Sequence, residues 1–115
     1  MKYRLLATEA ALVDVDTIRR WIAERGAPLT ARRWVERLLV ALRTLSGNPT
    51  RCQVAAENAE VDEFEIRRFL FGKVRVLFTV VGAEVVILHV RHGSRRYATR
   101  DDLAPALREL GLEED

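Results

Sequence analysis

The sequence predicts an α+β fold: a small antiparallel β-sheet in βααβββ order, with a helical hairpin on one face and a short C-terminal helix. Two observations predict it. Apolar residues recur at helical spacing in two successive segments between residues 9 and 45. Three strand-like runs, separated by turn glycines, then follow between residues 64 and 90. A chain of 115 residues can bury one sizeable core, so we expect a single domain over residues 1–115.

The first half of the chain predicts one short strand and two helices. Residues 3–7 (YRLLA) are compatible with a strand, and Thr8 is placed to cap the helix predicted over residues 9–25. A second amphipathic helix is expected to begin at Thr30 and to end at the SGNP sequence of residues 46–49. Because only a few residues join the two helices, we expect them to lie as an antiparallel hairpin.

The second half predicts a β-meander. Residues 50–63 have no firm period, and we expect a loop there with at most a short strand. Gly72 and Gly82 then stand at the two positions where tight turns are needed between strands. The three strand-like runs are residues 64–71, 73–81 and 84–90.

A last short helix is expected after the meander. Thr99 and Asp102 have the spacing of a capping box, in which each residue's side chain accepts a hydrogen bond from the other's backbone. Pro105 falls in the first turns of this predicted helix, where a proline is tolerated.

Side-chain alternation assigns the faces of the predicted sheet. One face is almost wholly apolar and is expected to pack on the helices. The other face carries Arg68, Arg75 and His92, one from each strand or its end, with Arg68 opposite or diagonal to Arg75. Like charges that face each other across strands are destabilising, so this pair favours a site for an anion. The alternative is a solvated face whose arginine stems lie over apolar neighbours.

Three further residues are interpreted as structural. His89 falls on the core-facing side of its strand, where a histidine with satisfied hydrogen bonds is the commoner case. Trp21 and Trp34 are expected to pack in the core or within the helical hairpin rather than to form a binding platform.

Charge is distributed unevenly along the chain. Residues 65–100 hold eight basic and two acidic side chains, a net charge of +6, whereas the remainder carries −4. This imbalance indicates a surface for phosphate or for an acidic protein.

Cys52 is the one cysteine, which excludes an internal disulfide and is typical of a cytoplasmic protein. One cysteine and two histidines argue against a zinc site, and no cofactor motif is present. No segment approaches the roughly 20 apolar residues of a membrane span, so we expect no membrane association.

The strand block EIRRFLFGKVRVLFTVVGAEVVILHVRHGSRR (residues 65–96) resembles the RelE/ParE toxin superfamily of bacterial type II toxin–antitoxin systems. The helical hairpin and the meander match that superfamily in order and length, so the resemblance covers most of the chain. It implies a toxin whose function is one of two kinds. RelE-like members are mRNA endonucleases that act in the ribosomal A site, and ParE-like members poison DNA gyrase without nuclease activity.

The nuclease interpretation, which the two strand arginines and the histidine favour, assigns roles to named residues. Arg68 and Arg75 would hold the scissile phosphate through bidentate contacts, and Arg95 or Arg96 would hold a neighbouring phosphate. His92 could transfer protons near neutral pH, and Tyr97 could donate a hydrogen bond or stack on a base. No metal is required. We also expect replacement of Arg75 to leave folding intact, because it removes one of two like charges and exposes no unpaired acid.

The same resemblance implies the partners. We expect a cognate antitoxin, partly disordered when free, that covers the basic face or a groove of the helical hairpin. The target would be mRNA on the ribosome or, in the alternative, DNA gyrase.

Overall fold

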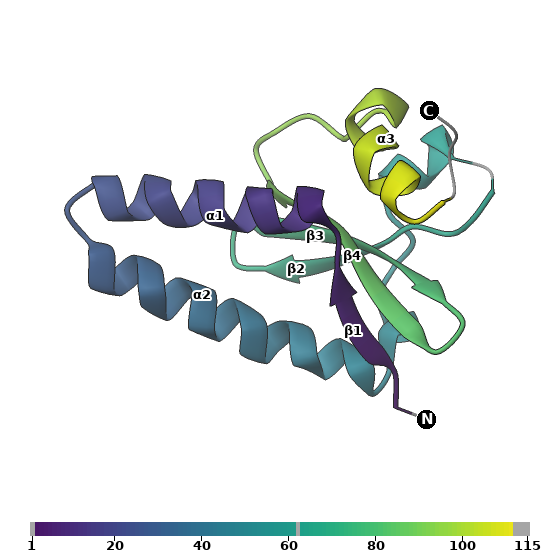
Figure 1. Cartoon of the computed structure of the whole chain (residues 1–115), viewed down its shortest axis with the longest axis horizontal. Coiled ribbons are helices and arrows are strands. Elements are labelled where there is room, and N and C mark those ends of the chain that lie inside the picture. The colour runs from purple at the N-terminus through teal and green to yellow at the C-terminus, as the bar shows by residue number, and fades with distance from the viewer. Residues whose placement is uncertain (1, 62, 112–115) are drawn as a thin grey trace.

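The computed structural model describes residues 2–61 and 63–111. Within these residues the chain forms a mixed β-sheet with helices on both of its sides (Figure 1). The elements, in chain order, are β1 (Arg4–Ala7), α1 (Glu9–Glu24), α2 (Pro28–Arg43), η1 (Thr44–Ser46), η2 (Pro49–Arg51), η3 (Ala56–Glu60), β2 (Arg67–Phe71), β3 (Val74–Val81), β4 (Glu84–His92) and α3 (Arg100–Glu109), where η marks a 3₁₀ turn.

The helical hairpin confirms the local signals in the sequence. The Thr8 hydroxyl accepts a hydrogen bond from the Ala11 backbone N–H at 3.1 Å, which caps α1 as predicted. Helix α2 begins at Pro28, two residues before the predicted start at Thr30. A proline is well suited to the first helical position, because its fixed φ matches the helix and its missing N–H would have no partner there.

The sheet differs from the prediction in one strand direction. Its order is β1-β4-β3-β2, with antiparallel pairing in the β2–β3–β4 meander. The predicted turns at Gly72 and Gly82 are confirmed, with φ values of 56° and 59° that favour glycine. β1, however, pairs with β4 in parallel, so the expectation of a wholly antiparallel sheet is wrong. Periodicity reveals which side chains share a face but not the direction of a neighbouring strand.

The long loop before β2 is more structured than the sequence indicates. It contains two 3₁₀ turns, η2 and η3, and one isolated bridge between Val54 and Arg67. β2 begins only at Arg67, because the residues predicted as its start lead out of this loop. The Asn58 side chain accepts a hydrogen bond from the Ile66 backbone N–H at 2.6 Å, which fastens η3 to the start of β2.

Both faces of the sheet are covered. The hairpin side of the sheet packs against α1 and α2 around Leu38, Phe78 and Ile87. The opposite side packs against α3 and the η3 loop around Ile66, Leu77 and other residues of a second core. The face predicted to be open and basic is therefore largely interior, because the C-terminal helix folds back over it (Figure 1).

A β-bulge in β4 reverses the predicted faces at the strand end. Leu77 pairs with His89, while the next residue of β3, Phe78, pairs with Ile87, so that the ladder passes over Leu88. Beyond the bulge Arg91, rather than His92, stands opposite Arg75. The prediction that His92 shares a face with Arg75 and Arg68 is wrong, because one additional residue inverts the alternation.

Candidate functional site

Arg75, the central residue of the predicted anion site, is held in an internal ion pair. Its Nη1 and Nη2 atoms each donate to one carboxylate oxygen of Glu57 at 2.7 Å. The Arg75 side chain is 11% exposed, and that of Glu57, which η3 supplies, is fully buried. The Tyr97 ring also covers the guanidinium, with its centroid 4.8 Å from Cζ. Both outer nitrogens of Arg75 are thus already engaged by an acid.

The surroundings of Glu57 favour its ionised form. Burial raises the pKa of this carboxyl, but hydrogen bonds from Arg75 and from backbone N–H groups outweigh burial and hold the pKa below its ordinary value. One of those groups is the Ala98 N–H, 3.2 Å from Glu57 Oε2. The hydrogen bonds that Arg75 donates to Glu57 in turn raise the pKa of Arg75 above its ordinary value. The pair is therefore a buried, charged link between β3, η3 and the segment that leads into α3.

Arg68 lies diagonal to Arg75 rather than opposite it, because β2 and β3 pair Arg68 with Leu77. The Arg68 side chain donates to the Gln53 amide oxygen. The structure therefore places Arg68 and Arg75 on one face, as predicted, but directs each to a different partner.

The remaining predicted residues lie around the strand-end loop. Arg96 donates to Asp102 at 2.7 Å, and these two side chains link the loop to the start of α3. This guanidinium and the Thr99 backbone N–H hold the pKa of Asp102 well below its ordinary value. His92 Nδ1 lies 2.7 Å from the Ser94 hydroxyl, on the hairpin side of the sheet. Tyr97 is 61% exposed.

Sequence reasoning missed Arg91. This residue is 4% exposed, and its Nη2 donates to the Arg96 carbonyl at 3.1 Å. In the described residues no acceptor contacts its Nε, and burial, with Arg95 nearby, lowers its pKa. Nothing in the sequence marks the bulge that brings Arg91 to this face, so no sequence signal could have found it.

An apolar groove of about 910 Å³ lies between the helical hairpin and the β2–β3 turn. Trp34 packs against Phe71 in it, with ring centroids 6.3 Å apart. Trp21 is 55% exposed and lines the same groove, so it is not the core or hairpin packing residue that the sequence predicts. Four basic side chains also line the groove: Arg37, Lys73, His92 and Arg95.

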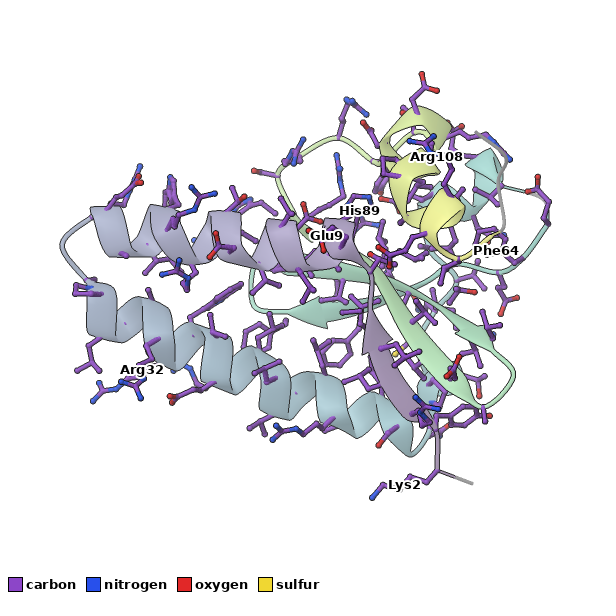
Figure 2. The ribbon with its side chains drawn as sticks, in the orientation of Figure 1. Lys2, Glu9, Arg32, Phe64, His89 and Arg108 are labelled. Carbon is purple, nitrogen blue, oxygen red and sulfur yellow. The ribbon has the colours of Figure 1, made fainter. Side chains whose placement is uncertain are left out.

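The acidic side chain that lines this groove, Asp14, is already engaged. Its Oδ2 lies 2.8 Å from His89 Nδ1 and accepts the Val90 N–H at 2.9 Å. His89 Nε2 lies 3.0 Å from the Asp102 carbonyl oxygen. His89 is thus a buried histidine whose two ring nitrogens contact the Asp14 carboxylate and the Asp102 carbonyl oxygen, and it lies between α1 and α3 (Figure 2). The groove therefore offers outside molecules an apolar floor and basic side chains.

Two properties of the described residues bear on other classes of function. No three histidine, cysteine, aspartate or glutamate side chains among them gather closely enough to hold a metal ion. None of the helices that the structure describes combines the length and hydropathy needed to cross a bilayer.

A helical hairpin on a β-meander with a basic strand end is the arrangement of the type II toxins of the RelE/ParE superfamily. The family model for the ParE toxin of type II toxin–antitoxin systems (parDE) matches residues 5–97, so the chain belongs to this family. Among solved structures, the chain is similar to one described as the chromosomal ParDE toxin–antitoxin system from P. aeruginosa. The identity is 22%, the TM-score is 0.65, and the match covers 79% of this chain and 96% of the other; it shows the shared fold. No curated protein matches the sequence.

Proposed function

We propose that this toxin poisons DNA gyrase and is not a ribosome-dependent mRNA endonuclease. The observation that carries the proposal is the pairing of Arg75 with the buried Glu57. An arginine that stabilises a phosphorane must present its donors to the phosphate, and here both outer nitrogens bind a carboxylate of the same chain. Membership of the ParE family supports the same conclusion.

The arrangement of the other predicted catalytic residues also favours the gyrase poison. His92, the proposed proton-transfer group, lies on the hairpin side of the sheet, whereas Arg68 and Arg75 lie on the α3 side. General acid–base catalysis requires the acid or base within hydrogen-bond reach of the reacting atoms, and a sheet separates these groups. The remaining strand arginine on the α3 side, Arg91, is buried. The proposed activity uses no metal or cofactor.

Two parallel assays test this proposal. Purified toxin is added to DNA gyrase, and both supercoiling and cleaved DNA–gyrase complexes are measured. Cellular mRNA is mapped by primer extension after induction of the toxin. We expect inhibited gyrase, trapped cleaved DNA and intact mRNA. New mRNA ends in ribosome-bound transcripts, with unaffected gyrase, would restore the nuclease interpretation and contradict ours.

We further propose that the cognate antitoxin covers the apolar groove between the hairpin and the β2–β3 turn. The antitoxin would bring an acidic segment with bulky apolar anchors, because the groove combines Trp21, Trp34 and Phe71 with four basic side chains. A segment of this kind is disordered when free and orders on binding. Toxin and antitoxin would meet in the cytoplasm.

Co-expression with the small gene next to the toxin gene tests the partner. We expect the two proteins to co-purify and the antitoxin to restore growth. A toxin with the charge reversal Arg37→Glu should bind its antitoxin more weakly, since it places an acid beside the proposed acidic segment. The matched control is Arg33→Glu, on the same helix but outside the residues that line the groove. Equal losses for the two variants would contradict the groove as the binding site.

A further inference from the structure

The Glu57 carboxylate occupies a position with the geometry of an oxyanion site. It receives two parallel hydrogen bonds from the Arg75 guanidinium, each 2.7 Å long, and a third from the Ala98 backbone N–H at 3.2 Å. Paired donation from one arginine is the geometry in which proteins bind carboxylates and phosphates alike. The three donors come from other segments of the chain than Glu57. β3 supplies the two Arg75 nitrogens, and the segment before α3 supplies the Ala98 N–H.

The neighbouring arginine on β4, Arg91, does not bind Glu57. Arg91 is the cross-strand partner of Arg75 on β4 and is 4% exposed. In the described residues no carboxylate forms an ion pair with Arg91, and its Nε has no hydrogen-bond partner. The acids that act on Arg91 are Asp102 and Asp14, whereas Glu57 binds Arg75. Glu57 is therefore the occupant of the Arg75 donors alone.

We propose that Glu57 is the internal occupant of a latent oxyanion site formed by Arg75 and the Ala98 N–H. In the native chain the carboxylate excludes outside anions from Arg75. Removal of the carboxylate opens the site to a free oxyanion that can accept the paired hydrogen bonds. The site consists of Arg75 and the Ala98 N–H with Glu57 as its occupant, and it does not depend on whether the toxin acts on gyrase.

The experiment is a chemical rescue of Glu57→Ala. Formate supplies the missing carboxylate, and inorganic phosphate tests the larger tetrahedral anion; chloride at equal ionic strength is the reference. We expect a Tm well below that of the native protein in chloride and a saturable rise with formate, roughly 5 °C at ten times the Kd. Rescue by both anions assigns the site to oxyanions in general, and rescue by formate alone assigns it to carboxylates; either supports the proposal.

Two controls separate the site from general anion effects. Glu60→Ala removes an exposed carboxylate from the same turn, where Glu60 accepts the Arg100 N–H at 3.1 Å, and should show no formate response beyond that of the native protein. The double variant Glu57→Ala/Arg75→Met should lose the rescue, because the paired donors are absent. A rescue that persists without Arg75, or no rescue in Glu57→Ala, would overturn the proposal.

A second variant covers the case in which Glu57→Ala does not fold. Glu57→Ser also removes the carboxylate and leaves space for a free anion, and refolding of either variant in formate or chloride gives the same readout. In the native protein the Arg75 guanidinium NMR signals should not respond to phosphate. A saturable response there would show that Glu57 does not exclude outside anions, and would also overturn the proposal.

Discussion

Arg75 on β3 and Arg91 on β4 stand directly opposite each other, and the bulge at Leu88 is what places them so. Without it, regular alternation would direct Arg91 to the hairpin side and His92 to the α3 side. Two facing arginines are unfavourable unless an acid neutralises them. The fully buried Glu57 neutralises one of them. Arg75, which the sequence assigns to an anion site, therefore links the sheet to η3 and, through Glu57, to the segment before α3.

Arg75→Ala is expected to destabilise the protein strongly. The change leaves the Glu57 carboxylate buried and without its main partner, which typically costs about 3–5 kcal/mol of unfolding free energy. The earlier expectation that no acid would be left unpaired is therefore wrong. The measurement is urea unfolding of the purified variant. Arg68→Ala, from the same face but bonded to Gln53 near the surface, is the control and should lose no more than about 1 kcal/mol. Equal losses of unfolding free energy in the two variants would show that the buried Arg75–Glu57 pair contributes no more to stability than the Arg68–Gln53 hydrogen bond.

Acid should remove the contribution of Asp102 to stability. The pKa of this carboxyl in the folded protein lies below its ordinary value of 3.8, chiefly because of the hydrogen bond from Arg96. Its stabilisation is therefore complete above pH 3.8 and disappears as the pH falls through the folded-state pKa. Asp102→Asn should be less stable than the native protein at pH 7, and the two should converge in strong acid. Urea midpoints across this range test the prediction; a pH-independent difference would contradict it.

The strand-face residues should be dispensable for toxicity. Under the proposed gyrase activity, Arg68→Ala and Tyr97→Phe should each change the concentration for half inhibition of supercoiling by less than about twofold. Removal of one preorganised donor from a nuclease transition state would instead lower cleavage by roughly 100- to 1000-fold. The gyrase assay, read beside growth after induction, distinguishes these outcomes. Loss of toxicity in a folded Arg68→Ala protein would favour the nuclease.

Trp21→Ala is expected to weaken antitoxin binding without unfolding the toxin. An aromatic anchor in a binding groove typically contributes 2 kcal/mol or more, which corresponds to roughly a 30-fold rise in Kd. Leu12→Ala is the matched control: it lies on the same helix, is 55% exposed like Trp21, and does not line the groove. Titration calorimetry with the purified antitoxin measures both. A similar loss in Leu12→Ala would place the contact elsewhere on α1.

The sequence by itself determined the features that depend on near neighbours. Both helices of the hairpin, the cap at Thr8, the two glycine turns and the capping box of Thr99 and Asp102 are all present as predicted, except that α2 begins two residues before its predicted start. Each of these depends on periodicity or on contacts within a few residues, and such preferences can be read along the chain. The two cores on opposite faces of the sheet and the parallel pairing of β1 with β4 could not be predicted in this way.

Tertiary structure alone decided which side chains form a site. The bulge at Leu88 has no sequence signature, yet it exchanges the faces of Arg91 and His92. The partner of Arg75 is a glutamate 18 positions away in a loop without a period. Alternation specifies the side of a strand, but it carries no information about which distant acid packs against that side. The charge pattern thus predicted an anion-binding face, and the folded chain supplies its own anion there.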